Sequence, residues 1–209
     1  MSERTITTEA TADREALPDL ATVDVEVTVD ADSASAARAT ARDRTATVRE
    51  TLTSIVASTD DVRTIDYRIK EGDNDFGPDI DGEFRAEIRL QVDCVPETVP
   101  DIVDSATDAS GTVPDVEFHL HEDVHQRLRD EALEGAMERA REKADHIAAV
   151  EGTAVGDMRE ATVGDGYVKT TSTVDDALSD LPDGNFQPTP ITVTESVTVV
   201  YDIADQSGG

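Results

Sequence analysis

The sequence predicts an α+β fold with helices packed on one face of a largely antiparallel β-sheet. Three patterns support this prediction: strands that alternate apolar and polar residues, connections that include both a hairpin and helices, and one long alanine-rich helix. The predicted order of elements is β-β-α-β-β-α-β-α-β-β. A chain of 209 residues can form one large domain. We therefore expect a single domain over residues 1–209, with two sub-lobes, at about 1–94 and 95–203, as the alternative.

The first half of the chain contains four predicted strands and one helix. The strands are expected at residues 4–11, 20–29, 62–69 and 84–94. The polar run from Asp13 to Glu15 is expected to end the first strand. One side of the third strand is formed by Ile65, Tyr67 and Ile69. Asp32 or Ser33 is the expected N-cap of the helix, because a side-chain oxygen there can accept a hydrogen bond from a free amide. The apolar positions of this helix are Ala37, Ala41, Val48, Leu52 and Ile55.

The second half begins with a short helix that Pro96 can start and Gly111 ends. A strand at residues 116–121 then leads into the long helix, residues 124–150, which Gly152 is expected to stop. Four alanines on one face of this helix form a shallow ridge that can lie close to a sheet: Ala132, Ala136, Ala140 and Ala144. Further strands are expected at residues 154–163 and 192–203. The polar segment 164–190 is expected to be a mobile loop, and residues 204–209 a disordered tail.

Acidic residues outnumber basic residues by 47 to 18, and the formal net charge is −29. The acids are spread over every segment of the chain. Self-repulsion at this density destabilises a compact chain in dilute buffer, whereas at molar salt the Debye length falls to about 3 Å and the repulsion is screened. We interpret the composition as adaptation to a salty cytoplasm; the alternative is an acidic face for a basic partner. Nucleic acid is not expected as a partner, because the sequence has no basic run to neutralise phosphates.

Cys94 is the only cysteine, so an intrachain disulfide is impossible. It continues the apolar alternation of residues 84–94, which predicts a buried and inert thiol; a reactive thiol would need a cationic neighbour. The first 15 residues lack an apolar core of signal-peptide length, and no run of 18 apolar residues occurs. We therefore expect a soluble, cytoplasmic protein without a transmembrane segment.

Several short pieces of the sequence follow the order of a known family. Pro18–Ala21, before alternating valines, is similar to an early P-D-x-A strand, and Asp61–Ile69 to a D-I-x-T-x-x-Y strand. Ala136–Ala144 resembles an A-x-x-x-A-x-x-K-A helix, Gly152–Gly156 a G-x-x-L-G step, and Pro190-Ile191 opens a similar final strand. Together these pieces span residues 6–203 and resemble the SIMPL-domain family, which includes bacterial periplasmic antigens and oxidative-stress defence proteins.

The resemblance implies an α+β domain with a tendency to self-assemble. It implies no established enzymatic activity, and it supplies no catalytic or cofactor-binding residues to carry over to this chain. Members of the family are commonly exported, so an exported location is the alternative to a cytoplasmic one.

His119, His121 and His125 form the one constellation with the spacing of metal ligands. On a strand, His119 and His121 project to the same face, and His125 falls in the first turn of the long helix. Glu122 or Asp123 could complete a nitrogen and oxygen site for a divalent ion such as zinc. The alternative is three solvent-facing histidines beside the start of a helix.

No other pattern assembles a catalytic set. Acid pairs such as Glu83 and Glu87 are expected by chance among 47 acids. The segment Gly164–Gly166 lacks the strand–loop–helix context of a phosphate-binding loop, and no G-x-S-x-G sequence is present. Lys143 lies on the flank of the long helix's apolar face, where we expect its stem to follow the surface or its ammonium to pair with a carboxylate. An interface role for Lys143 is the alternative.

The sequence therefore predicts a non-enzymatic, self-assembling scaffold or stress-related accessory protein, adapted to high salt. The predicted assembly is a homo-oligomer without a cofactor, and the sequence does not specify a protein partner. The alternative is a divalent-metal-binding protein that uses His119, His121 and His125. An enzyme of another type would need a deep pocket with converging polar groups.

Overall fold

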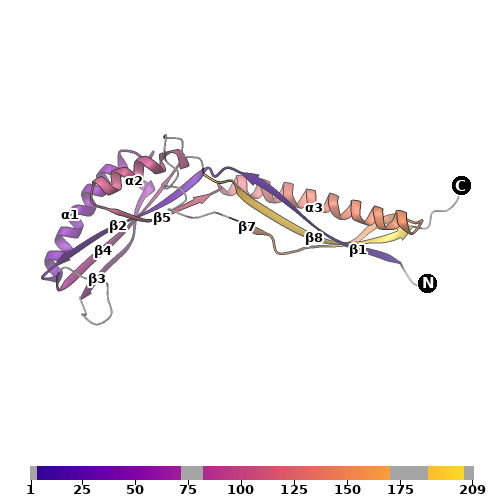
Figure 1. Ribbon diagram of the computed structural model, residues 1–209, viewed down its shortest axis with the longest axis horizontal. Coiled ribbons are helices and arrows are strands. Elements are labelled where there is room, and N and C mark those ends of the chain that lie inside the picture. Colours follow the sequence, from indigo (N-terminus) through magenta and orange to yellow (C-terminus); the bar gives the residue numbers. More distant parts are fainter. Residues whose placement is uncertain (1–3, 72–81, 170–187, 205–209) are drawn as a thin grey trace. The chain divides into compact units, whose positions relative to one another are not determined.

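The computed structural model describes residues 4–71, 82–169 and 188–204 and shows an α+β chain with antiparallel strands (Figure 1). The elements are, in order, β1 Thr5–Ala16, β2 Leu20–Ala31, α1 Ala34–Thr53, β3 Val62–Glu71, β4 Phe84–Cys94, α2 Val99–Asp108, β5 Thr112–His119, α3 Glu122–Val150, β6 Ala154–Val163, β7 Tyr167–Lys169 and β8 Ile191–Ala204. Short 3-10 helices, Thr59–Asp61 and Pro96–Thr98, precede β3 and α2. The predicted fold class is confirmed.

The strands form two sheets where we predicted one. A central unit comprises residues 18–119, and a terminal unit comprises residues 1–17, 120–170 and 190–209, each within the described ranges. The terminal unit is discontinuous in sequence because β1 pairs with β8 along its whole length. The division therefore differs from the sub-lobes expected at about 1–94 and 95–203. Alternation within a strand predicts the strand but not its partner, and here the partners lie near opposite ends of the chain.

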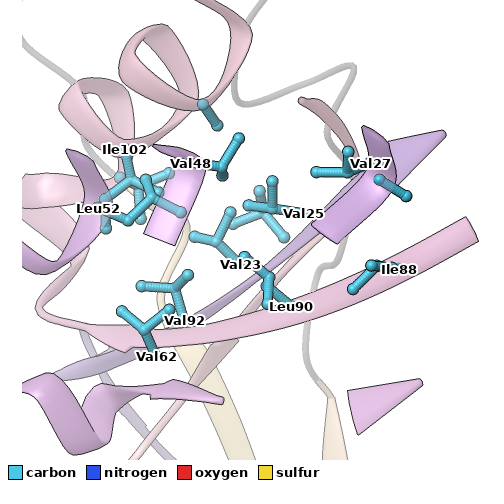
Figure 2. Packing of buried hydrophobic residues seen from close by; sticks show 14 of the residues in the cluster. Val23, Val25, Val27, Val48, Leu52, Val62, Ile88, Leu90, Val92 and Ile102 are labelled. Atoms are coloured by element: carbon cyan, nitrogen blue, oxygen red, sulfur yellow. The ribbon is translucent and has the colours of Figure 1, made fainter. Parts of the chain in front are cut away.

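The central unit has the strand order β3-β4-β2-β5, with α1 and α2 packed against one face (Figure 1). Alternate residues of β2 and β4 point to this face and meet apolar side chains of the two helices (Figure 2). The largest fully buried side chains of this core include Val23, Val25, Val48, Leu52, Leu90, Val92 and Ile102. Ser33, one of the two predicted caps, accepts a hydrogen bond from the amide of Ala36 over 3.2 Å.

A β-bulge changes the predicted pattern of β3. The register with β4 shifts between Thr64 and Asp66, so Ile65 is left out of the alternation and 46% of its surface is exposed. Thr64 pairs with Leu90, and Tyr67 pairs with Ile88, both of which are buried under the helices. Thr64 and Tyr67 therefore lie on the same, helix-covered side of β3, although residues three positions apart in a regular strand point to opposite faces.

The terminal unit has the strand order β1-β8-β6, and β7 also pairs with β8. α3 runs along one face of this sheet (Figure 1), and its buried positions include Ala132, Ala136, Ala140, Ala144 and Ala148. The short side chains let the helix approach closely enough for Thr8 Oγ1 to donate to the carbonyl of Ala140 over 2.9 Å. Gly152, with a φ of 67°, follows the helix as predicted.

Four predicted boundaries are wrong. β1 continues through Asp13 to Ala16, because pairing with β8 satisfies its backbone whatever the side chains are. β5 ends at His119, before His121. Within the expected loop 164–190, Tyr167–Lys169 form β7, while residues 170–187 lie outside the described residues. Of the expected tail, Ala204 belongs to β8, and residues 205–209 again lie outside them. Among the helices described, none has the length and apolarity to cross a membrane.

Candidate functional site

β8 carries a carboxylate on the face of the sheet that α3 covers. Val193, Val197 and Val199 point to this face and are buried. Glu195 lies in the same alternation, so its side chain points to the same face, and only 2% of its surface is exposed. Arg129 of α3 donates from Nε to Oε1 of Glu195 over 2.6 Å. This hydrogen bond raises the pKa of Arg129, and the attraction of the carboxylate adds to it. The pair therefore ties β8 to α3 by a charge-assisted bond within an otherwise apolar layer.

The turn before β7 encloses the same carboxylate. A Cβ built on Gly166 would lie 2.5 Å from Oε1 and 2.8 Å from Oε2 of Glu195, so the backbone can approach only because residue 166 is glycine. Oε2 is buried and has no hydrogen-bond partner among the described residues. Glu195 is not among the functional residues that we predicted from the sequence. The signal in the sequence is that Glu195 takes the place of an apolar residue in the alternation Val193, Val197, Val199.

The three histidines of the predicted metal site lie in different surroundings. His119 ends β5 in the central unit, with Nε2 3.4 Å from Oε2 of Glu117. His121 is the N-cap residue of α3 and not a strand residue, and His125 follows in the first turn, both in the terminal unit. Nε2 of His125 is buried without a hydrogen-bond partner among the described residues.

The described part of the chain contains no group of three or more His, Cys, Asp or Glu side chains that could hold a metal ion. The expectation that His119 and His121 share one face of a strand does not hold, because the strand ends between them. Metal binding by these residues stays a prediction, and a calorimetric titration of His121→Ala with zinc would test it.

Cations of α3 bind two carbonyls in the middle of one edge of the terminal-unit sheet. Lys143 donates from Nζ to the carbonyl of Glu9 over 2.7 Å, and Arg139 donates to the carbonyl of Thr11 over 2.6 Å. Both carbonyls belong to β1, an edge strand, and would otherwise be open to a strand of another molecule. Lys143 therefore binds a backbone carbonyl, where we expected a surface-following stem or a carboxylate partner.

The opposite edge binds a cation of α3 where it begins. Arg141 donates to the carbonyls of Val155 and Gly156 over 3.3 and 3.1 Å. Within the segment from Asp157 to Val163, Arg159 pairs with Asp202 of β8. Register shifts on both sides of Met158 bend the strand, and pairing with β8 is regular again from Glu160 onward.

We call residues 157–163 of β6 together with β7 the open edge. Four large apolar side chains are exposed along it: Met158 at 53%, Val163 at 52%, Tyr167 at 62% and Val168 at 45%. A strand edge with exposed apolar side chains is a surface on which another strand or protein can pack. The open edge therefore offers an apolar surface for another molecule, whereas cations of α3 lie along the middle of the β1 edge.

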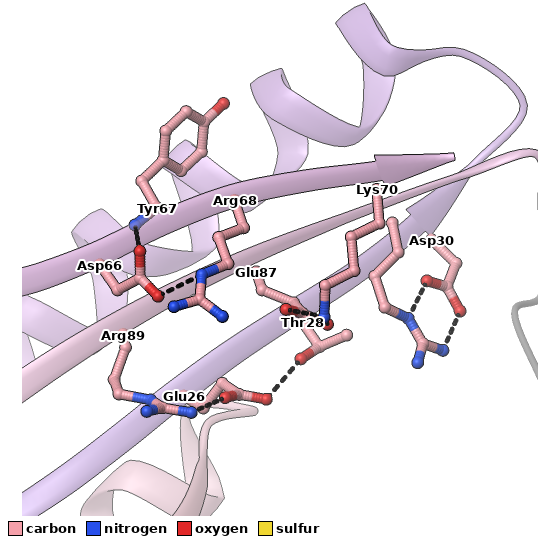
Figure 3. Close-up of polar contacts among 10 residues, drawn as sticks. Glu26, Thr28, Asp30, Asp66, Tyr67, Arg68, Lys70, Glu87 and Arg89 are labelled. Atoms are coloured by element: carbon pink, nitrogen blue, oxygen red, sulfur yellow. Dashed lines mark hydrogen bonds and ion pairs between the residues drawn. The ribbon is translucent and has the colours of Figure 1, made fainter. Parts of the chain in front are cut away.

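The uncovered face of the central sheet is held together by ion pairs between strands (Figure 3). Arg85 of β4 binds Asp30 of β2 through two bonds of 2.7 and 2.8 Å, and Arg89 binds Glu26 over 3.0 Å. Each of these pairs joins residues directly opposite each other in the ladder, where unlike charges stabilise a sheet. On this face, Arg85 and Arg89 therefore neutralise acids on the neighbouring strand β2.

Cys94 ends β4 and is half-buried. Burial raises the pKa of its thiol to about 11; a hydrogen bond with Thr98 acts in the opposite direction, and the carboxylates of Asp93 and Asp61 add to the increase. At neutral pH the thiol is therefore protonated and a poor nucleophile, in agreement with the predicted inert cysteine.

These features define a class: an antiparallel α+β protein of two sheets, one covered on one face by α1 and α2 and the other by α3. A family model described as "SIMPL: Protein of unknown function (DUF541)" matches residues 6–201. The chain belongs to the SIMPL family, as the ordered sequence pieces indicated. A search of curated proteins finds no match to it.

Proposed function

We propose that this chain is a non-enzymatic, self-associating module, a scaffold or stress-related accessory protein, whose open edge packs against a second copy of the chain. The observation that carries the proposal is the difference between the two edges of one sheet. Lys143 and Arg139 bind carbonyls in the middle of β1, whereas four exposed apolar side chains border β7 and the part of β6 beyond Gly156. Cations on one edge and exposed apolar side chains on the other favour a defined pair over an endless chain of strands.

High salt is part of the proposal. Two chains that each carry a formal charge of −29 repel each other in dilute buffer. At molar KCl the Debye length falls to about 3 Å, so only charges in contact still matter. Between Asp157 and Val163 the open edge has two acids and one arginine, a nearly balanced stretch in a strongly acidic chain. Association should therefore increase with salt.

The test is light scattering coupled to size-exclusion chromatography at about 0.2 M and about 2 M KCl, which separates screened from unscreened repulsion. Val163→Lys puts a charge on the open edge, where it should return the associated protein to the monomer at high salt. Val95→Lys is a matched control: Val95 is 54% exposed, Val163 is 52% exposed, and both variants add one positive charge, but Val95 lies in the central unit.

A wild-type protein that stays monomeric at both salt concentrations would contradict self-association. Equal losses in Val163→Lys and Val95→Lys would place the interface elsewhere. Circular dichroism of each variant at high salt shows that a loss of association is not a loss of folding.

A further inference from the structure

A groove in the central unit gathers arginines that have no carboxylate partner among residues 4–71, 82–169 and 188–204. It lies between α1 and β3 and has a volume of about 370 Å³. Its polar lining consists of Arg42, Thr45, Arg49, Thr64 and Tyr67, and we call it the arginine groove. α1 carries four arginines and two acids, the reverse of the balance in the whole chain, where 47 acids oppose 18 basic residues.

The arginines of this helix face have neutral partners. Arg49 donates to the carbonyl of Val62 and, over 2.6 Å, to Oγ1 of Thr64. Arg38, one turn before Arg42, donates from Nε to the hydroxyl of Tyr67 over 3.1 Å.

Arg42 is exposed and makes no hydrogen bond or ion pair with any described residue. In a chain so rich in carboxylates, unlike charges normally find each other, as they do on the uncovered face of the same sheet. Arginines grouped here without a carboxylate from the described part of the chain therefore indicate a place for an anion from outside the chain.

The bulge in β3 completes the site with hydroxyl groups. By removing Ile65 from the alternation, it brings Thr64 and Tyr67 to the side of β3 that faces α1. Each of these hydroxyls accepts a hydrogen bond from an arginine, so its own proton remains free to be donated to a ligand. Thr45, only 8% exposed, adds a buried Oγ1 that has no hydrogen-bond partner in the described structure.

We propose that the arginine groove binds a small organic phosphate monoester. The terminal oxygens accept hydrogen bonds from the guanidinium groups of Arg42 and Arg49 and from the hydroxyls of the groove. Three terminal oxygens match this many donors better than the two oxygens of a carboxylate do. The organic part of the ligand packs on Ala46, Ile88 and the ring of Tyr67, which form the apolar part of the lining.

The experiment is isothermal titration of the folded protein at molar KCl with four probes: phenyl phosphate, inorganic phosphate, benzoate and phenol. Phenyl phosphate should bind most tightly, because it alone has both the phosphate and an apolar ring. Its affinity should fall as KCl is raised, while any binding of phenol should not change. Amide shifts in nuclear magnetic resonance spectra should be confined to α1, β3 and the neighbouring part of β4.

Two variants locate the binding. Arg42→Gln should weaken the affinity for phenyl phosphate about tenfold, the usual effect of losing one charge-assisted hydrogen bond, and the fold should persist because Arg42 supports no structural contact. Arg44→Gln removes the same charge from the same helix outside the lining of the groove, and should leave the affinity within about twofold.

Three results would overturn the proposal. The first is no binding of phenyl phosphate to the wild-type protein. The second is an equal loss in Arg42→Gln and Arg44→Gln, which would show attraction to the net charge of the helix only. The third is benzoate or phenol binding as tightly as phenyl phosphate, which would show that the groove does not recognise phosphate.

Discussion

The thiol of Cys94 should react far more slowly in the folded protein than in the unfolded chain. Burial at the end of β4 raises its pKa from 9.0 to about 11. At pH 8 the thiolate fraction falls from about one tenth to about one thousandth, so alkylation, which consumes only the thiolate, should be about 100-fold slower. At neutral pH the thiol is protonated in both states, so it does not affect the free energy of unfolding. As the pH rises from 9.0 towards 11, the free energy of unfolding should fall, because only the unfolded chain then readily forms the thiolate.

The assay is the rate of alkylation by iodoacetamide at molar KCl, measured at several pH values between neutrality and about 10, with the chain unfolded in guanidinium chloride as the reference. The native rate should increase about tenfold for each pH unit, because the thiolate fraction does. Asp61→Asn should raise the rate by removing a carboxylate that raises the pKa, and Thr98→Val should lower it by removing the hydrogen bond that favours the thiolate. If the folded protein reacted as fast as the unfolded chain, the conclusion that folding protects the thiol of Cys94 would be refuted.

Two further predictions concern stability, measured by urea unfolding at molar KCl. Gly166→Ala should lower the free energy of unfolding by about 1–3 kcal/mol, because the new methyl group would lie within 2.5 Å of a carboxylate that is enclosed and held by Arg129. A loss below about 0.5 kcal/mol, typical of a surface change, would show that the turn moves away freely. Leu90→Ala should cost about 3–5 kcal/mol, because Leu90 is fully buried in the central core and its removal leaves a cavity. A cost near that of an exposed leucine such as Leu17, which is 61% exposed, would contradict the assigned packing of β4.

Local patterns predicted most of the elements well. Strict alternation predicted β4 with the bounds Phe84–Cys94, and a weaker pattern predicted β6 with the bounds Ala154–Val163, as the structure shows. The ends of two helices were also predicted from nearby residues. The amide of Ala36 donates to Ser33 within one turn of α1, and Gly152, with its positive φ, lies just after α3. In each case the residues that determine the structure are close together in the sequence.

The candidate sites were less predictable, because they depend on contacts between distant segments. Glu195 looks like one more acid among 47 until Arg129, 66 residues away, and the turn at Gly166 enclose it. The arginines of α1 look like ordinary surface charges until the bulge at Ile65 turns Tyr67 toward them. The histidines show the opposite case: their spacing suggests a metal site, but the strand ends between His119 and His121.

The sequence by itself therefore determined the α+β class, the order of strands and helices apart from β7, and the family. These depend on periodicity, composition and short ordered pieces, all of which are local. Only the tertiary structure decided that there are two sheets, that β1 pairs with β8, and which edge Lys143 and Arg139 bind. The physical reason is that strand pairing satisfies backbone hydrogen bonds between segments of any separation, and no local pattern records which segments will meet.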